Sequence, residues 1–265
     1  MNKSDVSPLI IAHRGASELA PENTPAAFER AISDGAEGIE FDVRLAKDAV
    51  VVFHDATLQR VGLIKGSISN LTAAELNKID VGSWFNQRFP HQSAEDFSAE
   101  TIPTLTQTLE FLKDFKGLIY IELKCRESEV GTLSKAVCEI IKNSPLQPQI
   151  IVKSFQLEVI PTVKNLCPDV KTAALFAPKI LTILRKEKRL INIAEELGAN
   201  MVSIHFSLAT RKLMKKAEKK NLSVTIWTAD HPRWIKRAVD LGIFAVITNN
   251  PARLLKKRTE SLRQN

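Results

Sequence analysis

The sequence predicts an α/β fold, a (β/α)8 TIM barrel with an added hairpin strand and a small insertion. Nine short apolar, β-branched segments recur along the 265 residues, and stretches of helical periodicity separate most of them. Such alternation is typical of a parallel sheet wrapped by helices. One pair of strands has no helix between its members, and without its return strand eight strands remain, the number that closes a barrel. We expect one domain over residues 1–265.

The apolar segments are the expected strands. They cover residues 9–13, 38–43, 50–53, 118–123, 149–155, 171–176, 200–206, 222–228 and 244–248. Helical periodicity is found in residues 23–35, 104–115, 128–143, 191–198, 208–220 and 231–242.

The pair of strands without a helix lies in residues 38–53. Its turn falls at Lys47 and Asp48, where there is room only for a hairpin. Pairing from that turn places His54 roughly opposite Phe41, beside Glu40 and Asp42.

Residues 56–103 fit no alternation of strands and helices. A stretch this long without regular elements is usually a functional insertion in a compact domain. Lying above the barrel mouth, it would shape the pocket and make Phe85 a contact to the substrate. In a second interpretation, Trp84 and Phe85 only anchor the insertion to the barrel.

Composition and cysteine content indicate a globular protein of a reduced compartment. Hydrophobic residues make up 44% of the chain and charged residues 25%. Cys125, Cys138 and Cys167 form no CxxC motif and are odd in number. The sequence shows no apolar segment of signal-peptide or membrane-span length, so we expect a cytoplasmic protein.

The formal net charge of +7 favours an anionic partner. Lysine and arginine concentrate in residues 185–189, 211–220 and 256–265. We interpret these runs as solvated helix faces and a frayed tail, with weak attraction to membranes or nucleic acid as the alternative. We therefore expect a small-molecule substrate, no nucleic-acid binding and no stable membrane insertion. The oligomeric state is not indicated.

Acidic residues lie near the ends of two expected strands. Residues two apart in a strand share a face, so Glu40 and Asp42 point the same way, as do Glu122 and Lys124. In a barrel that face is the interior near the top. Carboxylates in one small space repel each other unless a cation sits among them, and an all-oxygen ligand set suits Mg²⁺ or Ca²⁺. The alternative is that nearby lysines and arginines neutralise them.

Two histidines at strand ends form a second group. With a pKa near ~6.5, His13 and His54 could share one proton at neutral pH and so supply one base and one acid. Each is followed directly by a charged residue. His91, His205 and His231 lack such neighbours, and we expect them to be surface or structural residues.

Fixed positive charge is also expected at this end of the barrel. Arg14 and Lys124 are suited to binding phosphate oxygens, Arg14 bidentately. A base, an acid, a hard metal ion and an anion clamp together indicate cleavage of a phosphoryl ester.

These residues lie in motifs that resemble the glycerophosphodiester phosphodiesterase family, within the phosphatidylinositol-phospholipase-C-like phosphodiesterase superfamily. The motifs AHRG, PENT, EFDV, FHD, GSWF, IPTL, IELK, SF, IWT and ITNNP occur in that family's order over nearly the whole chain. The resemblance implies a barrel enzyme that uses one divalent cation. It would hydrolyse glycerophosphodiesters, such as deacylated phospholipids, to sn-glycerol 3-phosphate and an alcohol.

The resemblance also implies roles for individual residues. His13 and His54 would be the acid/base pair, and Glu40, Asp42 and Glu122 the metal ligands. Arg14 and Lys124 would contact the phosphate, and Trp227 would form an aromatic pocket wall. Glu22 and Asn23 belong to the ENT motif. Asn23 is expected to order the loop after the first strand.

The sequence departs from the family pattern at four residues. Pro25 replaces an aliphatic residue, which the first turn of a helix tolerates. Thr106 and Gln107 stand where glutamates are usual, and Asn249 replaces a usual aspartate. These changes bear on headgroup preference, metal choice and rate, while the predicted ligands and histidines are retained.

Two other functions are compatible with such a barrel. A phospholipase or sphingomyelinase D-like enzyme would act on intact lipid and would need an exposed apolar patch or a secretion signal. A non-catalytic barrel would hold anionic lipid or nucleic acid on its basic surface, but here the histidines and carboxylates are all present. The sequence does not indicate whether the ion is Mg²⁺ or Ca²⁺, or which alcohol is esterified in the substrate. The first nucleophile is either water or the glycerol 2-hydroxyl.

Overall fold

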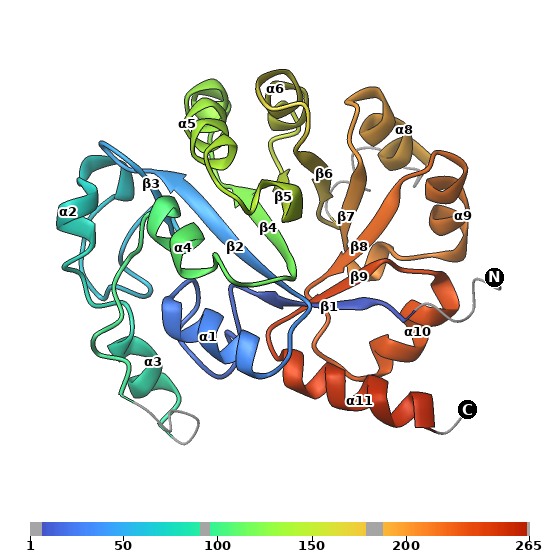
Figure 1. Ribbon diagram of the computed structural model, residues 1–265, viewed down its shortest axis with the longest axis horizontal. Coiled ribbons are helices and arrows are strands. Elements are labelled where there is room, and N and C mark those ends of the chain that lie inside the picture. Colours follow the sequence, from blue (N-terminus) through green and yellow to red (C-terminus); the bar gives the residue numbers. More distant parts are fainter. Residues whose placement is uncertain (1–6, 91–95, 179–187, 264–265) are drawn as a thin grey trace.

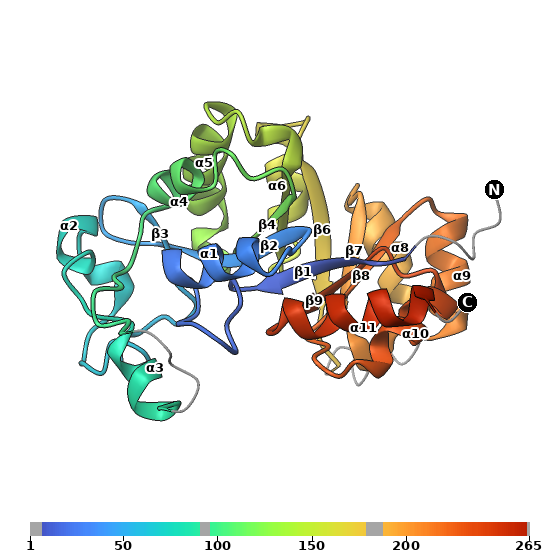
Figure 2. The same ribbon diagram turned by 60° about the horizontal axis from the view of Figure 1, so that its bottom comes forward.

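A computed structural model describes residues 7–90, 96–178 and 188–263 of the chain. Within these ranges, eight parallel strands form a closed ring in the order β1-β9-β8-β7-β6-β5-β4-β2, closed by pairing of β1 with β2. Strand β3 pairs with β2 outside the ring. Figures 1 and 2 show the helices arranged around the strands. The predicted TIM barrel with an added hairpin strand is confirmed.

The strands fall where the apolar segments predict them, with small differences at the ends. Their bounds are β1 (Leu9–His13), β2 (Gly38–Leu45), β3 (Val50–Val52), β4 (Leu118–Leu123), β5 (Ile150–Ser154), β6 (Lys171–Phe176), β7 (Met201–His205), β8 (Ser223–Trp227) and β9 (Ala245–Thr248).

Most of the helices lie outside the ring and follow a strand, whereas α2 and α3 belong to residues 56–103. Their bounds are α1 (Pro25–Ser33), α2 (Ala73–Leu76), α3 (Ser83–Arg88), α4 (Leu105–Phe111), α5 (Val130–Lys142), α6 (Val159–Leu166), α8 (Lys188–Glu196), α9 (Arg211–Lys219), α10 (Arg233–Leu241) and α11 (Pro251–Arg263). Short 3-10 turns are η2 (Ile68–Asn70), η3 (Glu127–Glu129), η4 (Gln147–Gln149) and η5 (Phe206–Leu208). Among the helices that the structure describes, none is long and apolar enough to cross a membrane.

Three of the four departures from the family pattern, Pro25, Thr106 and Gln107, lie in the first turn of a helix. Pro25 is the first residue of α1, where Thr24 accepts a hydrogen bond from the Ala27 amide. Gln107 and Thr104 form a reciprocal capping box at the start of α4. The Gln107 side chain therefore accepts from the backbone amide of Thr104 at the helix terminus.

The interior of the barrel is apolar toward the amino-terminal ends of the strands and polar toward their carboxyl-terminal ends. Ile11, Tyr120, Ile151 and Ile247 belong to a buried cluster inside the ring. Two residues further along β4 and β5, on the same face, stand Glu122 and Lys153. Because parallel strands end at one edge of the sheet, these polar residues collect at the carboxyl-terminal mouth.

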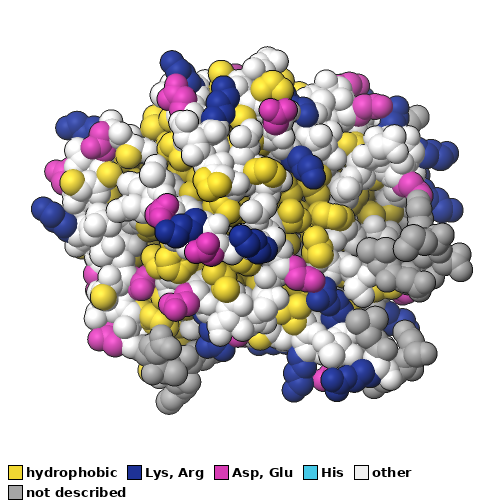
Figure 3. All heavy atoms as spheres, viewed as in Figure 1, with side chains coloured by type: hydrophobic (Ala, Val, Ile, Leu, Met, Phe, Trp, Pro, Cys, Tyr) yellow, Lys and Arg dark blue, Asp and Glu magenta, His cyan; other side chains and the backbone are white. Residues whose placement is uncertain are grey.

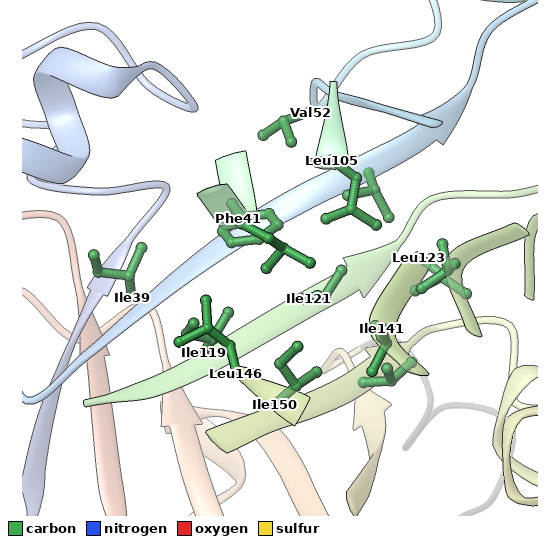
Figure 4. Close-up of a cluster of buried hydrophobic side chains, with 14 of the residues drawn as sticks. Ile39, Phe41, Val52, Leu105, Ile119, Ile121, Leu123, Ile141, Leu146 and Ile150 are labelled. Carbon is green, nitrogen blue, oxygen red and sulfur yellow. The ribbon is translucent and has the colours of Figure 1, made fainter. Parts of the chain in front are cut away.

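Side chains that alternate with the polar ones point outward under the helices. Ile39 and Phe41 of β2 and Ile121 of β4 are fully buried in a cluster that includes Leu105 of α4 and Ile141 of α5. Figure 4 shows these side chains between the strands and the helices. This packing holds the strands that carry the acidic residues.

The hairpin of β2 and β3 has the predicted turn. Val43, Arg44 and Leu45 pair with Val52, Val51 and Val50, and the Ala46 amide donates to the Ala49 carbonyl across Lys47 and Asp48. The Phe53 amide donates to the Asp42 carbonyl beyond the last pair. The chain thus delivers His54 next to the acidic end of β2.

Residues 56–103 are more regular than expected, since they contain η2, α2 and α3. Elements of three to six residues are too short to show periodicity in a sequence. The segment has its own buried cluster, in which the Phe85 ring lies 5.7 Å from Trp84, 5.0 Å from Phe89 and 5.7 Å from Phe97, between ring centroids. Val51 of the hairpin packs in the same cluster, so these aromatics anchor the insertion.

The basic run at residues 211–220 forms α9 and behaves as a solvated helix face. Lys212, Lys215 and Lys219 are exposed, whereas Leu213 is buried against the barrel. Figure 3 shows charged side chains both around the periphery and near the centre of the face it displays. His91 and most of the run at 185–189 lie outside the described residues.

Replacing Phe85 by alanine is expected to destabilise the protein by about 3–5 kcal/mol, because the ring is fully buried among three aromatics. Urea unfolding monitored by circular dichroism measures this change. Phe111→Ala is the matched control, since Phe111 is 44% exposed, and a comparable loss in both variants would contradict the proposed anchoring.

Candidate active site

Three acidic side chains meet inside the mouth of the barrel. Glu40 and Asp42 of β2 have no exposed surface, and Glu122 of β4 is 5% exposed. One carboxylate oxygen from each lies within 4.8 Å of the others. Strand register produces this meeting, because Asp42 and Glu122 are direct partners on neighbouring parallel strands.

The chemistry of this acidic cluster fits a hard divalent cation. Glu40 Oε1, Asp42 Oδ1 and Glu122 Oε1 are buried, and each faces a lysine ammonium group. Buried carboxylate oxygens are normally satisfied by hydrogen bonds or by cations. Three such oxygens in one small space are a ligand set that Mg²⁺ or Ca²⁺ could use.

Side-chain cations also contact the acidic cluster. Among the described residues, Arg14 Nε lies 3.0 Å from Asp42 Oδ2, and Lys124 Nζ contacts Glu122 Oε1 and lies 3.4 Å from Asp42 Oδ1. Lys153 Nζ lies 2.8 Å from Glu40 Oε1. The ion pairs expected as the alternative to a metal are therefore present. The same three carboxylates also form a ligand set for a metal ion.

These cations set the direction of each carboxyl pKa. Burial acts to raise the pKa of Asp42, but Arg14 and Lys124 outweigh it and the pKa is lowered. Burial likewise opposes the lowering of the Glu40 pKa, which Lys153 and then His13 produce. For Glu122, burial prevails over Lys153 and the pKa is raised.

His13 ends β1 beside the acidic cluster. Its Nε2 lies 3.9 Å from Glu40 Oε2, and its Nδ1 lies 2.6 Å from Asn249 Oδ1. Asp230 accepts from both the Asn249 side-chain amide, at 2.9 Å, and the Asn249 backbone amide, at 2.7 Å. Because a carboxylate only accepts, it turns the Asn249 oxygen toward His13.

His54 follows the hairpin and is held in a similar way. Its Nδ1 lies 2.6 Å from Asp55 Oδ1, and its backbone oxygen accepts from Arg44 Nε at 2.7 Å. Burial lowers the pKa of His54, opposed mainly by Asp42. Burial lowers the pKa of His13 as well, opposed mainly by Glu40.

The loop after β1 is tied to the acidic cluster by a backbone amide and by the Asn23 side chain. Arg14 and Asn23 have φ angles of 56° and 61°, a left-handed conformation that is uncommon for residues other than glycine. The Arg14 amide donates to Glu40 Oε2 at 3.1 Å. Asn23 donates to Asp42 Oδ2 and accepts from the Asp42 amide. Asn23 therefore orders this loop, as expected from the ENT motif.

The insertion reaches the site through Arg60. Arg60 Nε donates to Asp55 Oδ2 at 2.6 Å, and its other nitrogens donate to Glu22, which also accepts from Arg14. Arg60 thus connects the partner of His54 to the loop that carries Arg14.

Trp227 ends β8 in a group of aromatic rings. Its ring centroid lies 5.5 Å from Phe155 and 5.4 Å from His205. Phe155 is exposed, and Lys124 Nζ lies 5.6 Å from its ring centroid. Trp227 is therefore joined to the acidic cluster through Phe155 and Lys124, which suits the predicted pocket wall.

Phe85 does not join the other predicted site residues. Its side chain is fully buried in the cluster of the insertion, so it offers no surface to a substrate. The prediction of Phe85 as a ligand contact is corrected accordingly. A tryptophan and phenylalanine next to each other in a polar segment can equally indicate local packing, which is what the structure shows.

Lys153, Asp55 and Asp230 were not singled out from the sequence as site residues. Lys153 carries a detectable signal, because a lysine two residues after Ile151 shares its inward face in an otherwise apolar strand. Asp55 directly follows His54. Asp230 gives no comparable signal, since its contact with Asn249 arises only where two loops meet.

The closed barrel, with an acidic cluster beside cationic side chains at its mouth, defines a TIM-barrel protein whose site suits a hard cation and an anionic substrate. The sequence profile described as the glycerophosphoryl diester phosphodiesterase family matches residues 13–253. The chain therefore belongs to this family of hydrolases.

Individual relatives agree with this assignment. A glycerophosphodiester phosphodiesterase of Caldanaerobacter subterraneus subsp. tengcongensis is 30% identical over 248 residues, covering 93% of this chain and 96% of the relative. YhdW of Bacillus subtilis (strain 168) is 33% identical over the same length and with the same coverage. The structure of an Oleispira antarctica phosphodiesterase in complex with the product sn-glycerol-3-phosphate has a TM-score of 0.81 at 27% identity, covering 95% of this chain and 96% of that one.

Replacing Asp42 by asparagine is expected to weaken binding of Mg²⁺ or Ca²⁺ at least about tenfold, the size of effect that groups adjoining metal ligands produce. The change removes one of three buried carboxylates that face one another. Isothermal titration calorimetry without substrate measures the effect. Asp114→Asn is the exposed control, and equal affinities in the two variants would argue against a metal at this cluster.

Proposed function

We propose that this enzyme hydrolyses glycerophosphodiesters to sn-glycerol 3-phosphate and an alcohol, using one divalent cation, Mg²⁺ or Ca²⁺. The observation that carries the proposal is the convergence of three buried carboxylates in the acidic cluster, which adjoins Arg14 and Lys124 at the same end of the barrel as both histidines. Membership of the family and the relative bound to sn-glycerol-3-phosphate support it.

Phosphate binding is assigned to Arg14 and Lys124. Their side chains are 16% and 15% exposed, so both reach the mouth while contacting the acidic cluster. An arginine fork and a lysine ammonium both suit phosphate oxygens. A cation held by Glu40, Asp42 and Glu122 would stabilise charge on the phosphoryl oxygens.

The acid and base are assigned to His13 and His54. In each ring Nδ1 faces an oxygen acceptor, Asn249 or Asp55, and a proton on Nδ1 leaves Nε2 for the substrate. Burial favours the neutral form of both rings, which is the form that accepts a proton. An anionic phosphodiester favours protonation of one ring, which can then donate to the departing alcohol. The nucleophile is water, or the glycerol 2-hydroxyl followed by water.

The reaction itself is tested by release of sn-glycerol 3-phosphate from glycerophosphocholine, glycerophosphoethanolamine and glycerophosphoglycerol. We expect release with Mg²⁺ or Ca²⁺ and its loss with EDTA, because the charge on the phosphoryl oxygens would no longer be stabilised. An enzyme-coupled assay for glycerol 3-phosphate measures it. Folded protein that releases no product with any diester and either ion would contradict the proposal.

Replacing either histidine by alanine is expected to lower kcat by about 10²- to 10⁴-fold with little change in KM, because proton transfer is needed only in the transition state. His13→Ala and His54→Ala are compared with His231→Ala in steady-state kinetics. His231 is exposed and accepts from the Arg233 amide at the start of α10. Near-normal turnover in His13→Ala or His54→Ala would show that the residue is not an acid or base.

A further inference from the structure

Lys153 is a buried lysine in direct contact with the acidic cluster. Its side chain is 2% exposed, and its Nζ lies 2.8 Å from Glu40 Oε1 and 3.6 Å from Glu122 Oε2. It is the register partner of Glu122 on β5, a strand that supplies none of the residues assigned above. Burying an ammonium group costs free energy unless anionic groups compensate, so Lys153 depends on these two carboxylates.

Lys153 differs from the other two cations of the site in its freedom to move. Arg14 and Lys124 are partly exposed at the mouth and can turn toward a bound phosphate. Lys153 is enclosed by the barrel, with the apolar Ile151 below it on the same face. Its charge therefore stays beside Glu40 and Glu122 whatever enters the mouth.

We infer that Lys153 is a fixed counter-charge beside Glu40 and Glu122 that lowers the affinity of the acidic cluster for its divalent cation. The inference rests on the proposed metal site. Without a metal ion, Arg14, Lys124 and Lys153 balance the three carboxylates, which keeps like charges together in a buried space. With an ion bound, the fixed ammonium repels it, so the site binds more weakly than three carboxylates alone would.

A purely structural ion pair leads to the opposite expectation. If Lys153 only stabilised the barrel, removing it would loosen Glu40 and Glu122, and metal binding would weaken. If it competes with the metal, removing it strengthens metal binding. The sign of the change in affinity therefore separates the two roles.

The test is calorimetric titration of the chelator-treated full chain with MgCl₂ and CaCl₂, without substrate. For Lys153→Met we expect a Kd lower by about tenfold or more than that of the wild type, because a unit charge within a few ångströms of the ion no longer repels it. We also expect a lower metal-free unfolding temperature and a larger rise on adding the ion. Lys171→Met is the control, because Lys171 is exposed at the start of the next strand, and its Kd should equal that of the wild type.

A charge-balanced pair of variants guards against misfolding of Lys153→Met. Glu122→Gln is compared with the double variant Glu122→Gln/Lys153→Met, which should bind the ion more tightly than Glu122→Gln alone. An unchanged or weaker affinity in either comparison would overturn the role of Lys153 alone. No binding of either ion by the wild type would overturn the metal site and this inference together.

Discussion

The burial of three carboxylates in one small space is the constraint on which the rest of the site depends. Ionised groups so close together repel each other, and moving each one out of water is costly. The fold compensates with Arg14, Lys124 and Lys153 and with the amides of the loop after β1. The left-handed backbone at Arg14 and Asn23 belongs to the same arrangement, since this loop brings donors to Glu40 and Asp42.

Alternation along the strands gives the barrel a rigid support for these charges. In β2, Glu40 and Asp42 face inward while Ile39, Phe41 and Val43 pack under the helices. The same residues that form the core therefore fix the direction of the carboxylates. A site built on strands held from behind in this way is more precise than one built on loops.

The histidines depend on a different kind of support, which comes from loops. His13 relies on Asn249, which Asp230 orients from the preceding loop, and His54 relies on Asp55, which Arg60 of the insertion holds. The departure from the family's usual aspartate at residue 249 thus places a neutral amide, not a carboxylate, beside His13. The insertion contributes to the site through a charged side chain, while its aromatic residues serve its own packing.

The sequence by itself determined the strands, the eightfold barrel, the hairpin turn and the residues of the acidic cluster, because all of these follow from local periodicity of two and 3.6 residues and from strand-end polarity. It could not decide that Phe85 is buried, since an aromatic pair looks the same whether it packs inward or faces a pocket. Nor could it reveal the contacts of Lys153 with Glu40 or of Asp230 with Asn249. Such contacts join side chains from different strands and loops, and only the pairing and curvature of the strands bring them within bonding distance.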